Sequence, residues 1–177
     1  MTMKDQLFAL IVPEEFKRHY QQHTFEISGL LNWAKVLGGD IVLINEDLSK
    51  YDILMTNVSS TESEYISVAR QANPDATIIA CFDYGFDVVN QYFSSLARVR
   101  EVMARADHIF SVNLNQWTWM RHLLPKRTVH YIPHPSDIQS IAKFHTAPET
   151  RRGLGAMWHQ YANYQIQSLL VAQAAEA

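Results

Sequence analysis

Six short apolar runs limit most strongly what this chain can fold into. Each run has four to six residues and is apolar almost throughout, and most are followed by a stretch with helical spacing. The runs occupy residues 7–12, 41–44, 52–56, 77–82, 107–112 and 128–132. Strands that are apolar on both sides need cover on both faces, which is typical of a parallel sheet between helices. We therefore predict an α/β fold, a Rossmann-like three-layer sandwich with a mostly parallel sheet of about six strands.

Helix signals lie between these runs. Residues 59–72 open with a capping-box pattern, and the pair Gly38-Gly39 is a stop signal for the helix before it. Apolar residues three or four apart mark three further helices, at residues 25–37, 88–105 and 116–124. The alternation of strands and helices therefore continues through most of the chain.

The same pattern divides the chain into three parts. Residues 1–143 contain all six runs and form the predicted Rossmann-like N-terminal domain. Residues 144–152 contain Pro148 and polar side chains, and we predict a linker there. Residues 153–177 add one apolar strand and one helix, which is too little for a second core. We expect this tail either to open a truncated second domain or to pack on the first.

Composition argues against several classes of protein. The formal net charge is -3 and the basic residues are scattered, so we expect no nucleic-acid partner. No apolar run approaches the roughly 20 residues that span a bilayer, and the N-terminal residues lack a signal-peptide pattern. We predict a cytoplasmic protein and leave peripheral membrane contact open. The single cysteine, Cys81, lies within an apolar run, so we expect a buried, structural thiol.

Polar residues follow the predicted strands, at the edge where parallel α/β sheets bind ligands. Their carboxylates, amides and hydroxyls suit sugar hydroxyls or another polar small molecule. The residues that we single out are Glu14, Asn57, Asp83, Tyr84, Asn113 and His134. Such residues also cap the next helix in many proteins, and we favour that role for Ser59, Ser60 and Asn115.

Neither a bound nucleotide nor a metal is expected in this chain. The first strand leads into Pro13 and Glu14 instead of a glycine-rich phosphate loop, and no P-loop pattern occurs. Glu15, His19 and His23 would share one face of a helix, but they lack the zinc-protease order. We interpret them as a solvated polar face, and we predict no metal site.

Residues 96–137 carry a more specific pattern. A helix leads to Ala106-Asp107 and a strand that ends in residues 111–113, and a short helix follows. The next strand ends in residues 132–137, which read IPHPSD. This succession resembles the close of the N-terminal domain of GT-B-fold, group 1-type glycosyltransferases. The resemblance extends over residues 7–137 and is clearest in their last third.

The resemblance implies a role for each predicted site residue. Asp83 occupies the place of an active-site His or Asp, so it becomes the catalytic candidate. The other five would contact a sugar or glycoconjugate acceptor. The UDP- or GDP-linked donor would bind a C-terminal domain, of which residues 154–175 resemble the opening strand and helix. We therefore expect the isolated chain to lack the donor site and to be inactive.

Two other functions stay open. A flavodoxin-like binding or signalling module is one, because residues 10–15 and 51–57 resemble the first and third strands of a receiver domain. Asn57, however, stands at the end where the phospho-acceptor aspartate would lie. A non-enzymatic oligomerisation domain is the other. Trp117 and Trp119 lie two apart on a predicted helix, so we expect that they do not both face inward. One indole would be exposed or would cover a neighbour, and an exposed indole could drive self-association.

Overall fold

The computed structural model describes residues 6–15, 17–18, 30–58, 63–82 and 96–135. All of them belong to the first unit, Met1–Ile141, of the two into which the chain divides. In chain order the elements are β1 (Phe8–Ile11), α2 (Asn32–Leu37), β2 (Asp40–Val42), β3 (Ile53–Asn57), α3 (Ser63–Ala72), β4 (Thr77–Phe82), α5 (Leu96–Ala104), β5 (His108–Ser111), α6 (Leu114–Leu123) and β6 (Val129–Tyr131). The predicted linker and tail, residues 144–177, lie outside the described part of the chain.

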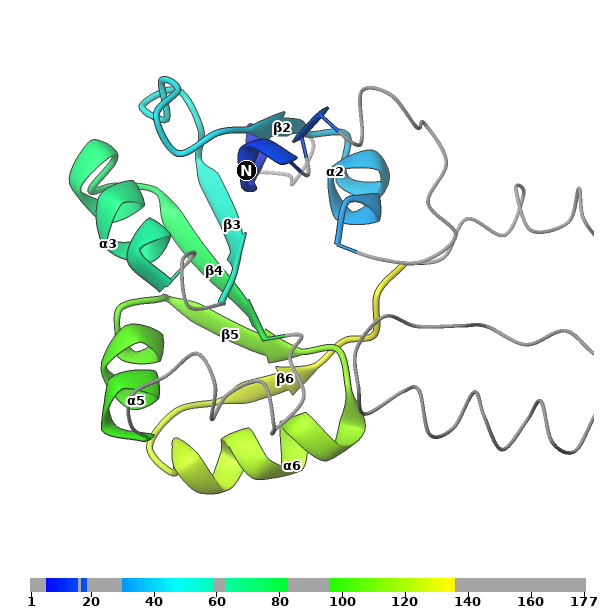
Figure 1. Ribbon diagram of the computed structural model, residues 1–177, viewed down its shortest axis with the longest axis vertical. Coiled ribbons are helices and arrows are strands. Elements are labelled where there is room, and N and C mark those ends of the chain that lie inside the picture. The colour runs from blue at the N-terminus through cyan, green and yellow to red at the C-terminus, as the bar shows by residue number, and fades with distance from the viewer. Residues whose placement is uncertain (1–5, 16, 19–29, 59–62, 83–95, 136–177) are drawn as a thin grey trace, which may run out of the picture. The chain divides into compact units, whose positions relative to one another are not determined.

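The six strands form one sheet in which every neighbouring pair is parallel (Figure 1). Their order is β2-β1-β3-β4-β5-β6, and helices alternate with them along the chain. Each predicted apolar run overlaps one of the strands. This confirms the predicted Rossmann-like α/β fold.

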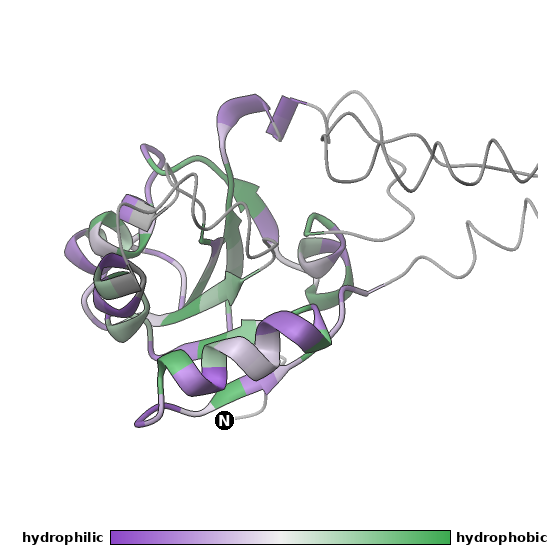
Figure 2. Cartoon of the chain, turned by 60° about the horizontal axis from the view of Figure 1, so that its bottom comes forward, coloured by the Kyte–Doolittle hydropathy of each residue, from purple (hydrophilic) through white to green (hydrophobic). Residues whose placement is uncertain are grey.

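Helices cover both faces of the sheet, which gives three layers. Helices α3, α5 and α6 lie on one face and α2 lies on the other (Figure 1). The first face buries Leu54, Ile66, Ile78, Phe82, Met103, Ile109 and Met120. The second face buries Phe8, Leu10, Met55, Cys81 and Phe110 against Leu30, Leu31 and Ala34. Figure 2 shows the hydrophobic strands inside and hydrophilic stretches on the outer turns of the helices. Cys81 is fully buried, as its place in an apolar run predicts.

Helix α2 ends at the predicted glycine pair. Gly38 has a φ of 66°, the left-handed conformation that a residue with a Cβ adopts at a cost. The Gly39 N–H then donates to the Ala34 carbonyl oxygen (2.9 Å) and closes the last turn. The chain thereby enters β2 directly beside β1.

Both tryptophans of α6 are half-buried and pack against the core, so the prediction that they do not both face inward was wrong. The Trp117 Nε1–H donates to the Val129 carbonyl oxygen on β6 (2.8 Å). Trp119 packs against Phe82 on β4, with 5.9 Å between the ring centroids. Helix α6 packs on both β5 and β6, so side chains two residues apart can both meet the core.

Within these described ranges, no helix combines the length and the apolar character that crossing a membrane requires.

Candidate functional site

The strand order places a topological switch point between β1 and β3. Strand β2 lies on one side of β1, and strands β3 to β6 follow one another on the other side of β1. Ligands of such sheets bind outside the carboxyl ends of the strands at this point. Four of the six predicted site residues are described: Glu14, Asn57, Asn113 and His134. Asp83 and Tyr84 lie outside the described residues.

Buried polar residues gather at this carboxyl edge. Within the described ranges they are Asn32, Thr56, Asn57 and Ser111. The Thr56 hydroxyl donates to the Asn57 carbonyl oxygen (3.2 Å), and the Ser111 hydroxyl donates to the Asn113 carbonyl oxygen (3.2 Å). Buried polar groups are normally satisfied in this way. Thr56 and Ser111 therefore act in the turns that follow β3 and β5.

Asn57 differs from them, because only the oxygen of its side-chain amide has a hydrogen-bond partner among the described residues. Its side chain belongs to a residue that is 4% exposed, and its Oδ1 accepts from the Val58 N–H (3.1 Å). The Nδ2 donor has no hydrogen-bond partner within the described part of the chain. Asn57 is in register with Cys81 and lies two residues after Met55, so its side chain lies on the α2 face, as theirs do. An unmet buried donor costs about 1–3 kcal/mol, which makes this amide a candidate ligand contact.

His134 lies on the same face through contacts with α2. Its Nδ1 accepts from the Trp33 Nε1–H (3.0 Å), and the Asn32 side-chain amide donates to the Pro135 carbonyl oxygen (3.0 Å). Trp33 also meets Phe110 of β5 edge to face, with 5.3 Å between the ring centroids. The segment that follows β6 therefore returns to α2 (Figure 1). We call the contacts of Trp33 with His134 and of Asn32 with Pro135 the tether. Asn57, Cys81 and Phe110 are neighbouring partners in the sheet register, so the tether lies near the side chain of Asn57.

Asn113 has a structural role at the start of α6. Its Oδ1 accepts from the N–H groups of Asn115 (2.8 Å) and Gln116 (3.5 Å), which makes it the N-cap residue. Asn115, for which we had favoured the capping role, instead supplies one of the capped N–H groups. A ligand contact of Asn113 stays a prediction, and such a ligand would bind beside a cap.

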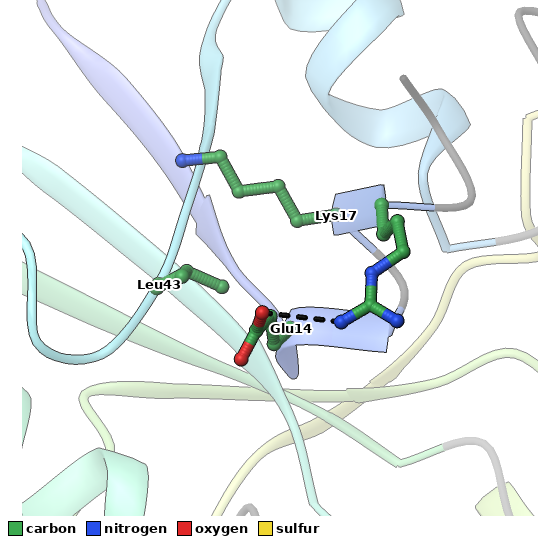
Figure 3. A pocket seen from close by; sticks show the side chains of 4 residues that line it. Glu14, Lys17 and Leu43 are labelled. Carbon is green, nitrogen blue, oxygen red and sulfur yellow. Dashed lines mark hydrogen bonds and ion pairs between the residues drawn. The ribbon is translucent and has the colours of Figure 1, made fainter. Parts of the chain in front are cut away.

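Glu14 lines a small open hollow together with Lys17, Arg18 and Leu43, with a volume of about 220 Å³ (Figure 3). An Arg18 Nη2–H donates to Glu14 Oε1 (3.1 Å). Lys17 forms an ion pair with Glu46, in the loop after β2. The hydrogen bond from Lys17, helped by the Leu43 N–H, holds the pKa of the Glu46 carboxyl below its ordinary value, although burial opposes this.

The sequence did not reveal several residues of this edge. Four of them are Asn32, Trp33, Lys17 and Arg18. Asn32, Trp33 and Lys17 contact partners distant in the chain, and Arg18 contacts Glu14, one helical turn away. A useful sign for two of them is the polar and aromatic pair Asn32-Trp33 inside an otherwise apolar stretch.

Asp107, part of the glycosyltransferase-like pattern, lies at the opposite edge of the sheet. Its carboxylate accepts from the Ile78 N–H (2.8 Å) and pairs with Arg70. Arg70 also donates to the carbonyl oxygens of Pro74 and Ala76. Partial burial alone would raise the pKa of Asp107, but the Ile78 N–H and Arg70 outweigh it and hold that pKa below its ordinary value. This part of the pattern therefore marks an anchor for the start of the strands.

No group of three or more His, Cys, Asp or Glu side chains in the described ranges could hold a metal ion. His19 and His23 lie outside those ranges. No protein-family model, no curated protein and no solved structure matches the chain. The fold and the edge define the class: a Rossmann-like parallel α/β domain with polar side chains at the carboxyl ends of its strands.

Proposed function

We propose that this domain is the acceptor-side part of a glycosyltransferase. It would bind a sugar or glycoconjugate acceptor at the carboxyl edge, while a UDP- or GDP-linked sugar binds on a separate C-terminal domain. The proposal is supported by the sequence pattern of residues 96–137 and by the Rossmann-like fold. The observation that carries it is the Asn57 amide, which is buried at the switch point and whose Nδ2 has no hydrogen-bond partner among the described residues.

The chemistry of the edge fits an acceptor rich in hydroxyl groups. Asn57 Nδ2 would donate to one hydroxyl oxygen, and Asp83 would accept the proton of the attacking hydroxyl as the general base. The hydroxyl oxygen then bonds to the anomeric carbon as the bond from that carbon to the diphosphate breaks. The diphosphate leaves with the electron pair, stabilised by the donor domain. Tyr84, Asn113 and His134 would contribute further acceptor contacts.

Binding of simple glycosides to the full chain tests this proposal. We expect methyl glycosides of common hexoses to shift the NMR signals of the Val58 backbone N–H and the Trp33 indole N–H. Asn57→Asp keeps the oxygen that Val58 uses and removes the free donor, so it should weaken binding about tenfold. Asn115→Asp makes the same change at an exposed residue near this edge that is not a proposed acceptor contact, so it should bind as the natural chain does.

Two results would contradict the proposal. One is the absence of any glycoside-dependent shift at this edge. The other is turnover of UDP-glucose or GDP-mannose by the isolated chain with ordinary kinetics, because the donor site is assigned to another domain.

The strand order favours a second candidate, a flavodoxin-like binding module. The run β2-β1-β3-β4-β5 is the order of flavodoxin-like sheets, whose ligands lie at the β1/β3 switch point. Asn57 occupies the end of β3, and a carboxamide has no carboxylate oxygen with which to form an acyl phosphate. Incubation with radiolabelled acetyl phosphate separates the two candidates: covalent labelling of the chain would favour the signalling module and count against the acceptor domain.

A further inference from the structure

Two ion pairs border the hollow after β1, and the first of them is well anchored. Lys17 binds the Glu46 carboxylate, which also accepts from the Leu43 N–H (3.1 Å). The Glu46 N–H in turn donates to the Leu43 carbonyl oxygen (3.1 Å), so the turn and the carboxylate hold each other in place. Only 24% of the Lys17 side chain is exposed. Lys17, the member of this pair that lines the hollow, is therefore held in place.

The second pair is open to exchange. Glu14 and Arg18 lie one helical turn apart, with their side chains 74% and 62% exposed. Exposed pairs of this kind contribute little to stability, so a ligand can replace the contact at low cost. Within the described part of the chain, Arg18 uses one of its five N–H donors and Glu14 uses one carboxylate oxygen. Both residues line the same hollow.

The chemistry of this lining selects a neutral ligand with adjacent hydroxyls. Glu46, which lies outside the lining, pairs with Lys17, and Glu14 pairs with Arg18. Each cation of the lining is therefore matched by a carboxylate, so neither an anion nor a cation gains net attraction. A hydroxyl both donates and accepts, and it can therefore use the carboxylate of Glu14 and the guanidinium of Arg18 together. Leu43 adds an apolar surface for the C–H face of a ring. The volume of about 220 Å³ is below the roughly 300–1,000 Å³ of pockets for larger ligands, so it suits a single ring.

We infer that the hollow lined by Glu14, Lys17, Arg18 and Leu43 binds one neutral hexose ring of the acceptor. Glu14 accepts from one hydroxyl and Arg18 donates to its neighbour, while Lys17 keeps the segment in place. This inference rests on the proposed function and adds to it a subsite, a substrate class and two residues.

Titration of the full chain with three glycosides tests the subsite by NMR. The probes are methyl α-D-glucopyranoside, methyl α-D-mannopyranoside and methyl α-D-galactopyranoside, with sodium sulfate as the anionic comparison. We expect at least one glycoside to shift both the Leu43 backbone N–H and the Arg18 Nε–H signals. Sulfate should shift neither by a comparable amount, because Glu14 repels it.

Matched variants assign the effect to the lining. Glu14→Gln should weaken the affinity about tenfold, equivalent to roughly 1.4 kcal/mol. Glu15→Gln removes the same charge from the neighbouring exposed residue, which does not line the hollow, and should leave the affinity unchanged. Both positions are exposed, so both variants should fold, as circular dichroism would verify.

Each other outcome overturns the inference. Glycoside shifts confined to Val58 and Trp33 would remove the subsite but leave the acceptor function standing. The absence of shifts at all four signals would contradict both. A sulfate effect at Arg18 equal to that of the glycosides would identify an anion site instead.

Discussion

Asp107 precedes β5 and joins the starts of neighbouring strands through its carboxylate. It accepts from the Ile78 N–H of β4 and from Arg70 at the end of α3. Arg127 reaches the carbonyl oxygens of Ala104 and Asp107 (3.0 and 3.1 Å) from the turn before β6. A residue that belongs to a functional-looking sequence pattern thus has a structural task, remote from the ligand edge.

Replacing Asp107 should lower the free energy of unfolding. Asp107→Asn keeps an oxygen for the Ile78 N–H but loses the charge opposite Arg70, so we expect a loss of about 1 kcal/mol for this partly exposed group. Urea unfolding at neutral pH measures it. Asp75→Asn, at an exposed turn residue, is the control and should change the free energy of unfolding little. Equal effects of the two changes would argue against the anchor.

The same group predicts a pH dependence. The pKa of Asp107 is lowered in the folded chain, so its contribution is present above the unfolded pKa of about 3.9 and is lost as pH falls through the folded value. The stability difference between the natural chain and Asp107→Asn should therefore be full at pH 6 and shrink below about pH 4. A difference that stays constant down to pH 2 would contradict the assignment.

At the scale of elements, the apolar runs and stop signals carry most of the information. Every predicted run overlaps a strand, and the ends differ by only a residue or two, as assigned element ends commonly do. Helix α2 ends at Leu37 and is capped by Gly38, the first residue of the predicted stop. Residues 30–31, which we predicted to be helical, form a turn instead. Local periodicity and glycine conformation are properties of neighbouring residues, so a sequence shows them directly.

Substitution at Gly39 should test why α2 needs two glycines. A Cβ at Gly39 would lie 2.5 Å from the Phe8 carbonyl oxygen, so Gly39→Ala must push β1 or β2 aside. We expect a loss of roughly 1–3 kcal/mol in thermal unfolding. Gly38→Ala meets no atom within 4 Å and should cost only the left-handed conformation, about 1 kcal/mol. Equal losses for the two would show that the contact with Phe8 is relieved.

At the scale of the whole molecule, the tether between α2 and the segment after β6 joins residues about a hundred positions apart. Trp33 and His134 are separated by 101 residues and Asn32 and Pro135 by 103. Helix α2 is short and has no side-chain cap at its start, so its position depends on these contacts and on the core beneath it. The tether therefore helps to position α2 on the face of the sheet where the Asn57 side chain lies.

A double-mutant cycle should measure this tether. Trp33→Phe keeps an aromatic ring near Phe110 and removes the N–H, and His134→Ala removes the acceptor. We expect the two changes together to cost about 1 kcal/mol less than the sum of their separate effects on the free energy of unfolding. Additive effects would indicate that the Trp33–His134 bond contributes nothing.

Sequence reasoning reached only part of the candidate site. It placed Glu14, Asn57, Asn113 and His134 at the carboxyl edge, because polar residues after apolar runs must lie there in a parallel sheet. It could not tell that the side-chain oxygen of Asn113 caps α6, whereas the side-chain nitrogen of Asn57 has no hydrogen-bond partner among the described residues. That difference depends on which N–H groups lie within reach, and the tertiary packing sets it.

The sequence by itself determined the class of fold, because strand and helix periodicities are local. Only the tertiary structure decided the strand order, since six runs that are apolar on both sides can pair in many ways. The contacts that shape the edge are likewise long-range: Lys17 meets Glu46, 29 residues away, and Trp33 meets His134, 101 residues away. Such pairs form only after the sheet has brought distant segments together, so no local pattern encodes them.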